Sequence, residues 1–406
     1  MTDWQEVKLG DIATITMGQS PKSEFYNSTG KGLPFLQGNR TFGLKYPTFD
    51  TYTTNPTKIA EAGDIIMSVR APVGDLNITP QKICLGRGVC SLRMKNGDQA
   101  FLYYLMKYNN TSLLNRESGT IFGSVNKSDI ESLIVNIPNG EVQKKIAGVL
   151  GALDDKIELN NKINQNLELQ AQALFKSWFV DFEPFGGTKP SDWKEIQLSE
   201  IADFIGGYSY KGTELRQSLT AMATIKNFDR NGGFKLDGYK EIEPSAKLKR
   251  NQYVELFDTL VAHTDLTQNA EVIGNAEMLL TKGKYKDIII SMDVVKVMPK
   301  NGISKYLLAA ILKDSRFKQH CLGYVNGTTV LHLSKRALPE YGLIFPKDVK
   351  ILDKISCLFE DLYKKIALNI EENMRLSGLR DTLLPKLMSG EINVDNVDIS
   401  QLKDTP

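Results

Sequence analysis

The sequence contains the same order of segments twice, and this internal repeat constrains the fold more than any other feature. The run WQEVKLGDIA at 4–13 returns as WKEIQLSEIA at 193–202, with five of ten positions identical. The run SGTIFGSVNKSDIESLIVNIP at 118–138 is matched in the same way by NGTTVLHLSKRALPEYGLIFP at 326–346. Matches in this order predict two globular domains of one design.

A helical segment follows each globular copy. The segments 146–174 and 355–383 align at a constant offset of 209 residues. In both copies, apolar residues recur at alternating spacings of four and three over more than four heptads, which predicts a coiled coil. Each copy also carries two asparagines in the middle of this apolar seam, where they set the register at a cost in stability. These register residues are Asn160, Asn164, Asn369 and Asn373.

The direction of helix pairing decides which asparagines meet. In an antiparallel pair Asn160 faces Asn373 and Asn164 faces Asn369, and each amide pair can satisfy itself. A parallel pair would place Asn160 on Asn369, and the repeat alone does not choose between the two. We favour the antiparallel pair because it gives the chain an internal pseudo-twofold axis. A helix of this length spans roughly 50 Å.

The predicted fold class is α/β (α+β): two copies of a globular domain, separated by two long helices that form an antiparallel coiled coil. The strand-like runs are short and broken by glycine, and each domain carries one or two helices. The expected domains are the first globular domain at 1–140, the central helix and spacer at 141–185, the second globular domain at 186–347, and the C-terminal helix and spacer at 348–406.

The composition excludes few classes of protein. The net charge of +2 over 406 residues means that a nucleic-acid surface would have to be a local patch. No apolar run approaches the length of a membrane span, and the N-terminus lacks a secretory pattern. We therefore expect a cytoplasmic chain without a membrane partner. Four cysteines without C-x-x-C spacing predict buried, reduced thiols: Cys84, Cys90, Cys321 and Cys357.

Catalytic motifs are missing from the sequence. The nearest match to an adenine methyltransferase motif, Asn55-Pro56-Thr57-Lys58, lacks the second proline. No phosphate-binding loop of the G-x-x-x-x-G-K-[ST] type occurs. The three histidines, His263, His320 and His332, have no metal-ligand spacing with cysteine. These observations favour a non-catalytic chain that binds no metal or cofactor itself.

The residues after each helix carry a family resemblance. LFKSWFVDFEPF at 174–185 and LLPKLMSGEI at 383–392 resemble the ends of the conserved regions of type I restriction-modification specificity subunits. The opening WQEVKLGDIA, together with SVRAPVG at 68–74 and LGRGV at 85–89, resembles segments of their target-recognition domains. The resemblance covers essentially the whole chain and recurs in both copies.

The resemblance implies a function and a set of partners. Each target-recognition domain would read one half of a bipartite target in double-stranded DNA, and the coiled coil would set the spacer between the halves. The helices would dock two modification subunits, which bind S-adenosylmethionine and methylate adenine. Restriction and translocase subunits would supply cleavage with ATP and Mg. The alternatives are a coiled-coil scaffold that reads no DNA and a stand-alone methyltransferase, which the missing motif disfavours.

Candidate DNA contacts are polar and cationic residues in loops, because base edges require donors and acceptors while phosphates require cations. For each residue the alternative is a solvated loop position, and Arg87 could equally hold its own turn. In the first domain the candidates are Arg40, Lys45, Arg70, Arg87, Ser118, Thr120 and Asn126. In the second they are Lys226, Asn227, Arg230, Thr264, Thr267, Gln268, Asn269, Asn326, Thr328 and Thr329.

Overall fold

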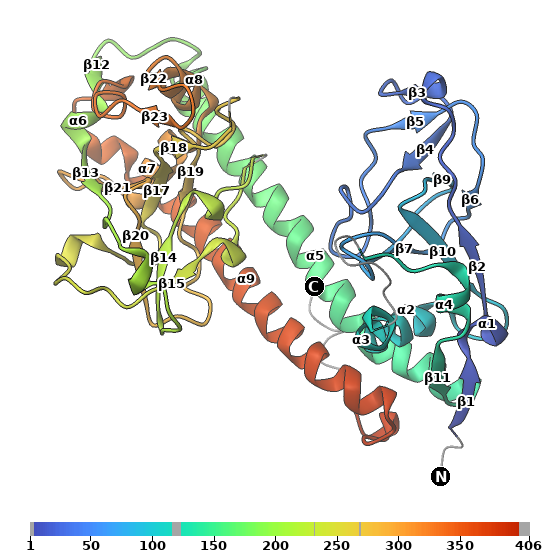
Figure 1. Cartoon of the computed structure of the whole chain (residues 1–406). Coiled ribbons are helices and arrows are strands. Elements are labelled where there is room, and N and C mark those ends of the chain that lie inside the picture. The colour runs from blue at the N-terminus through green and yellow to red at the C-terminus, as the bar shows by residue number, and fades with distance from the viewer. Residues whose placement is uncertain (1–3, 116–122, 231, 268, 398–406) are drawn as a thin grey trace. The chain divides into compact units, whose positions relative to one another are not determined.

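The chain divides into two compact units. A computed structural model describes residues 4–115, 123–230, 232–267 and 269–397 (Figure 1). Unit 1 consists of Met1–Leu159 and Asn373–Pro406, and unit 2 consists of Asn160–Glu372. Each unit therefore combines one globular domain with one part of each of two long helices. The structure is mixed α/β.

Unit 1 contains a strand pair, a four-stranded sheet and a five-stranded sheet. In sheet order these are β1 (Gln5–Lys8) with β11 (Ile134–Ile137); β2 (Ala13–Met17), β10 (Val89–Met94), β7 (Ile65–Ser68) and β8 (Leu76–Ile78); and β3 (Tyr26–Asn27), β5 (Tyr52–Thr53), β4 (Leu33–Leu36), β9 (Ile83–Leu85) and β6 (Ile59–Ala60). The helices are α1 (Leu9–Ile12), α2 (Gln99–Tyr108), α3 (Asn110–Leu114) and α4 (Lys127–Glu131). Strands β4 and β9 are parallel, so their carboxyl ends lie at one edge.

Unit 2 follows a similar scheme. In sheet order its strands are β12 (Trp193–Gln197) with β24 (Gly342–Pro346); β13 (Ala202–Gly206), β21 (Val294–Pro299), β17 (Thr259–Ala262) and β19 (Ala276–Met278); β15 (Lys240–Glu241), β14 (Thr220–Ala223), β20 (Asp287–Ile290) and β16 (Tyr253–Val254); and β18 (Thr264–Asp265), β23 (Leu331–Leu333) and β22 (Val325–Asn326). The helices are α6 (Leu198–Ile201), α7 (Lys305–Lys313) and α8 (Ser315–Leu322). Strands β14 and β20 form the parallel pair of this unit.

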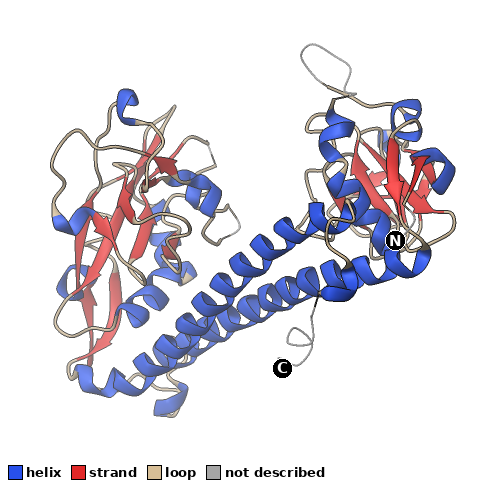
Figure 2. Cartoon of the chain, turned by 90° about the horizontal axis from the view of Figure 1, so that it is seen from below, coloured by secondary structure: helices blue, strands red, loops and turns tan. Residues whose placement is uncertain are grey.

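Two long helices complete the units: α5 (Gly140–Phe179) and α9 (Asp353–Met388), drawn in blue in Figure 2. In unit 2 the Asn369 Nδ2 donates to the Asn164 Oδ1 at 2.7 Å. The Asn160 Nδ2 donates to the Glu372 Oε2, also at 2.7 Å. Because later residues of α5 meet earlier residues of α9, these two segments run in opposite directions. The expected contact of Asn164 with Asn369 is present.

The helix segments of unit 1 meet through apolar side chains. Leu153 and Ile157 of α5 form a buried group with Leu376 of α9. Burying such side chains contributes about 1.5–3 kcal/mol each relative to exposure. The apolar seam predicted from the heptads is therefore the packed face of these segments.

The tryptophan that opens each repeat packs beside the end of a long helix. In unit 2 the buried Trp193 lies against Phe179 at the end of α5, with ring centroids 5.5 Å apart. In unit 1 a Cβ at Gly390, just after α9, would lie 2.7 Å from the Trp4 Nε1. Gly390 has a φ of +75°, so both the backbone and the indole ring favour glycine here. These contacts connect the repeat-opening runs to the helix-ending runs.

Candidate nucleic-acid interface

The parallel strand pair of unit 1 brings together two cationic residues that the sequence analysis selected separately. Arg40 lies in the loop after β4, and Arg87 lies in the loop after β9. Both line one cavity of about 790 Å³ at the edge where these strands end. Arg87 is exposed, and its guanidinium pairs with no residue in the described part of the chain. Arg40 donates through Nη2 to both Asp50 carboxylate oxygens, at 2.9 and 2.7 Å.

Arg70 lies at a second position in the same domain. Its backbone pairs with that of Ser124 in an isolated antiparallel bridge just after β7. Its side chain is exposed, and no ion pair joins it to a residue that the structure describes. Arg70 is thus available to a ligand. Two other candidates of this domain, Ser118 and Thr120, lie outside the described residues.

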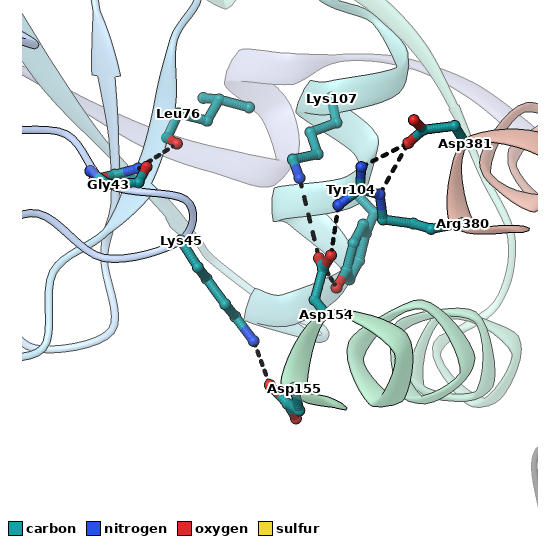
Figure 3. Close-up of polar contacts among 10 residues, drawn as sticks. Gly43, Lys45, Leu76, Tyr104, Lys107, Asp154, Asp155, Arg380 and Asp381 are labelled. Atoms are coloured by element: carbon teal, nitrogen blue, oxygen red, sulfur yellow. Dashed lines mark hydrogen bonds and ion pairs between the residues drawn. The ribbon is translucent and has the colours of Figure 1, made fainter. Parts of the chain in front are cut away.

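Lys45 is not free to contact DNA. Its Nζ lies 2.6 Å from the Asp155 Oδ1 on α5, and the side chain is only 13% exposed (Figure 3). Burial alone would lower the pKa of Lys45, but the hydrogen bond and charge of Asp155 raise that pKa above its ordinary value. This ion pair holds the 38–46 loop against α5 within unit 1. A DNA-contact role is therefore wrong for this residue.

Asn126 also has a local structural role. Its side chain accepts from the Asp129 backbone N–H at 3.1 Å, and the Asp129 carboxylate accepts from the Asn126 backbone N–H at 2.9 Å. This reciprocal pair caps the start of α4. The cap therefore uses the side-chain oxygen of Asn126, whereas a phosphate contact would use its amide N–H donors.

In unit 2, three predicted segments come together on one small sheet. β18 follows His263, β22 ends at Asn326, and both strands pair with β23. Asn326, Thr328 and Thr329 are exposed at this hairpin. Asn269 is exposed on the loop after β18, whereas Gln268 lies outside the described residues.

Other candidates of unit 2 are engaged in holding its loops. Thr264 is buried and donates from Oγ1 to the Asp293 Oδ1 at 3.2 Å. Thr267 donates from both its backbone N–H and its Oγ1 to the Asp265 Oδ1, at 2.8 and 2.9 Å. Thr264 was selected as a base contact because of its residue type, and its burial argues against that role. Thr267 stabilises the turn that presents Asn269.

The 224–235 loop also contains both buried and exposed candidates. Asn227 is fully buried, donates to the Lys235 carbonyl at 2.7 Å and accepts from the Thr224 backbone N–H at 2.8 Å. It cannot reach a nucleic acid, so its selection as a DNA contact is wrong. Lys226 is exposed. Arg230 is largely exposed and forms an ion pair with Glu271 at 3.0 Å.

The sequence analysis missed polar residues that the structure places beside these loops. In unit 1, Ser20 and Gln37 line the cavity that contains Arg40 and Arg87. In unit 2, the pKa of His263 is lowered, first by burial and then by the charges of His332 and Lys335. Gln37 directly follows the apolar strand β4 and precedes the 38–46 loop, and that position was one available signal.

A buried carboxylate connects the domain of unit 1 to both long helices (Figure 3). Asp154 of α5 accepts from the Tyr104 hydroxyl of α2 at 2.7 Å and from the Arg380 Nη1 of α9 at 2.8 Å. Lys107 of α2 lies 4.0 Å from the same carboxylate. Burial lowers the pKa of Lys107 although Asp154 opposes this shift. Arg380, which occupies an apolar seam position, is explained by this ion pair.

A buried lysine has the corresponding place in unit 2. Lys313 at the end of α7 lies 2.9 Å from the Glu277 Oε2 of β19 and 3.4 Å from the Glu168 Oε1 of α5. Burial alone would lower the pKa of Lys313, but the charges of Glu277, Tyr363 and Glu168, together with the hydrogen bond to Glu277, raise that pKa above its ordinary value. The lysine therefore stays charged and ties the domain to α5.

Three further properties of the described residues concern metal binding, membrane spanning and the state of the cysteines. Within them, no group of three or more His, Cys, Asp and Glu side chains is arranged to hold a metal ion. None of their helices has the length and apolar character needed to cross a bilayer. All four cysteines are free thiols; Cys84, Cys90 and Cys321 are buried as expected, whereas Cys357 is exposed, contrary to expectation.

Comparison with known proteins finds relatives of one kind. Residues 1–169 match the model of the type I restriction modification DNA specificity domain. The chain is 25% identical to the type I restriction enzyme MjaIX specificity subunit of Methanocaldococcus jannaschii, over 97% of this chain and 95% of that one. It is 26% identical to the HindI specificity subunit of Haemophilus influenzae, over 97% of this chain and 100% of that one. The chain is therefore similar to type I specificity subunits along nearly its whole length.

Two further proteins are similar to the chain. It is 42% identical to a protein named "Putative type I restriction enzyme MjaX specificity subunit" from M. jannaschii, and this match spans 41% of the chain and 40% of the relative's length. The crystal structure of the type I system S subunit from M. genitalium is similar, with a TM-score of 0.57 and 18% identity, over 95% and 96% of the two chains. At that identity the structural likeness supports the fold alone.

Proposed function

We propose that this chain is the non-catalytic, DNA-reading subunit of a type I restriction-modification enzyme, in which each globular domain reads one half of a bipartite target. One observation carries the proposal: the strand pair and one four-stranded sheet of unit 1 have counterparts of the same order in unit 2, and in both units exposed cationic or amide side chains lie on loops or at strand ends. In unit 1 these residues are Arg40, Arg70 and Arg87, and in unit 2 they are Lys226, Asn269 and Asn326. Donors of this kind recognise base edges and phosphates.

The proposed domain division is 1–140 and 186–347 for the two target-recognition domains, with the spacers 141–185 and 348–406 between and after them. The two long helices form an antiparallel coiled coil with a pseudo-twofold relation between the halves of the chain. The opposite direction of α5 and α9 around Asn164 and Asn369 supports this arrangement. In this proposal the coiled coil sets the spacer of the DNA target.

The proposed partners are double-stranded DNA, two modification subunits and the restriction subunits. The modification subunits would carry S-adenosylmethionine, and the restriction subunits would carry ATP and Mg. The surfaces of α5 and α9 that face away from each other would dock the modification subunits. The exposed Leu159 and Leu169 of α5 and Leu368 and Leu379 of α9 support this role, because exposed apolar side chains mark interaction surfaces.

Methylation mapping tests the proposed function. The purified chain alone should transfer no methyl groups to DNA. Together with its modification subunits it should methylate adenine within one bipartite sequence, and deleting the gene should remove that motif from the methylated positions of the source genome. Methylation that does not change on deletion would contradict the proposal.

An insertion tests the role of the coiled coil. Four residues inserted next to Asn160 add about 6 Å of helix. We expect a longer spacer and two unchanged half-sites. A matched insertion of four residues after Gly187, in the loop before β12, should change neither. Helix content by circular dichroism must be retained, because four residues shift the heptad register. A changed half-site would show that the helices are not only a spacer.

A further inference from the structure

Gln37 lies in a cradle that only glycine permits. It follows β4 directly, and the loop after the parallel strand β9 lies against its backbone. The Gly86 backbone N–H donates to the Leu36 carbonyl at 2.8 Å, and the Gly88 N–H donates to the Gln37 carbonyl at 3.0 Å. A Cβ at Gly86 would lie 2.7 Å from the Gln37 Cα, and a Cβ at Gly88 would lie 2.4 Å from the Gln37 carbonyl oxygen. The backbone of Gln37 is thus fixed from both sides.

A chain of two hydrogen bonds also orients its side chain. The Arg87 backbone N–H donates to the Ser20 Oγ at 3.2 Å. The Ser20 hydroxyl donates to the Gln37 Oε1 at 2.8 Å. Because the amide oxygen is turned to Ser20, the amide nitrogen with its two N–H donors is the atom presented elsewhere. Holding a side chain in this way reduces the entropy lost when it binds a ligand.

The charged groups of the cavity around Gln37 are two cations and one paired carboxylate. Arg40 and Arg87 line the same space of about 790 Å³. The lining carboxylate, Asp50, already accepts from the Arg40 Nη2 and from the Thr51 hydroxyl. The pKa of Asp50 is lowered, chiefly by the hydrogen bond from Arg40, so this carboxylate is charged and paired. The Gln37 amide nitrogen and the Arg87 guanidinium favour a ligand that offers acceptors.

Guanine is the base that fits this requirement. Its major-groove edge presents two acceptors, N7 and O6, and no donor. Adenine and cytosine each present an amino donor there, and thymine presents only one acceptor, O4, beside its methyl group. We infer that Gln37 is a specificity-determining residue that reads a guanine in the half-site of the first domain, and that Ser20 is its positioning residue. This inference rests on the proposed function, since it assigns one residue to the base reading proposed above.

The second domain has no glutamine at the position that corresponds to Gln37. Ala223 and Ile290 end its parallel strands in the register in which Leu36 and Leu85 end theirs, so Thr224 takes the place of Gln37. Thr224 is buried and donates to the Gly238 carbonyl at 3.2 Å. Gln37 should therefore influence one half-site only.

The test uses the chain assembled with its modification subunits and a panel of DNA duplexes. After the wild-type motif is mapped, each base pair of both half-sites is replaced in turn and methyl transfer is measured for wild type, Q37A, Q37E and Q81A. Gln81 is an exposed glutamine of the same domain and provides the matched control. A well-placed base contact changes discrimination by about tenfold.

For Q37A we expect discrimination to fall about tenfold at one G·C pair of one half-site, with all other positions unchanged. Q37E, which replaces the donors by acceptors, should lose more methyl transfer on the wild-type target than Q37A. Replacing that guanine by 7-deazaguanine should slow wild type but not Q37A, because N7 no longer accepts. Q81A should match wild type.

Variants of Ser20 separate positioning from folding. S20A should weaken discrimination at the same G·C pair by less than Q37A does, and S20T, which keeps the hydroxyl, should restore it. A motif that Q37A leaves intact, or a change at an A·T pair, would overturn the inference while the proposed function stands. A wild-type complex without any bipartite motif would instead overturn the proposed function.

Discussion

The two units tie their domains to the long helices with opposite charges. In unit 1 the central group is a carboxylate, Asp154, which accepts from Tyr104 and Arg380. In unit 2 it is an ammonium group, Lys313, which lies between Glu277 and Glu168.

The helix positions behind these networks are nevertheless equivalent. Lys107 and Lys313 each lie nine residues after the N-cap of their helix, Asp98 and Ser304. The offset of 209 residues places Asp154 of α5 on Tyr363 of α9. The environment of the shared lysine thus differs, and so does its pKa. Burial lowers the pKa of Lys107, whereas in Lys313 the acidic groups around it together outweigh burial and raise the pKa. The two domains therefore bury an equivalent lysine with different charged partners.

Removing Lys313 should have the largest effect on this comparison. K313M leaves the Glu277 side chain, which is 7% exposed, without its cation. Breaking a buried ion pair on one side costs about 3–5 kcal/mol. Hydrogen exchange should show this loss in α7 and β19, which is preferable to global melting because two units need not unfold together. K364M, which removes an exposed helix pair with Glu360, should leave the exchange rates close to those of wild type. Equal protection in both variants would contradict the role of Lys313.

Removing Arg380 should cost somewhat less. R380L leaves Asp154 buried, but the Tyr104 hydroxyl and Lys107 remain beside it. We expect a loss of about 3 kcal/mol, the lower end for a broken buried pair, visible as faster exchange in α2. Adding D154N should recover part of the loss, since no buried charge then remains. If the double variant is as unstable as the sum of both single changes, the two residues do not act as a pair.

Replacing an asparagine of the apolar seam should have the next largest effect on stability. N164L leaves the buried Asn369 amide without its partner, which costs about 1–3 kcal/mol. The double variant N164L/N369L should be neutral or stabilising, because two apolar side chains then meet. Hydrogen exchange of 160–179 and 353–372 measures both effects. A double variant that is less stable than N164L would show that the amide pair itself stabilises the helices.

The smallest expected effect is a pH dependence confined to unit 2. The folded-state pKa of His263 is lowered by burial, so the unfolded chain takes up the proton first as pH falls. The stability contributed by the neutral imidazole is present above about pH 6.5 and declines as pH falls from there toward the folded-state pKa. Exchange of β18 and β23 should therefore accelerate below that pH in wild type, relative to the intrinsic rate, but not in H263Q. Identical profiles for both proteins would contradict this assignment.

Patterns along the chain were sufficient to predict the mixed α/β fold class, the two long helices and one contact between them. Heptad spacing predicted the two long helices, and the symmetry of the asparagines predicted the contact of Asn164 with Asn369. These predictions succeed because side-chain periodicity follows directly from helix geometry. The Trp4 and Trp193 repeats carried a signal of the same kind, since both pack beside helix ends.

The candidate interface was less predictable, because burial depends on residues far away in the sequence. Lys45 is occupied by Asp155, 110 residues later, and Asn227 is buried by its own loop. Residue type alone cannot distinguish such side chains from free ones. Gln37 was missed because it directly follows an apolar strand and looks like part of it. The glycines at 86 and 88 are the sequence signal that backbone lies against it.

A domain exchange tests the central claim most directly. Residues 188–346, bounded by the loop after Gly187 and by the end of β24, are replaced with the corresponding domain of a specificity subunit that has a different target. The chimera, with its modification subunits, should methylate a motif in which one half-site is replaced while the other half-site and the spacer are retained. A motif in which both half-sites change would contradict the account of two independent readers on one framework.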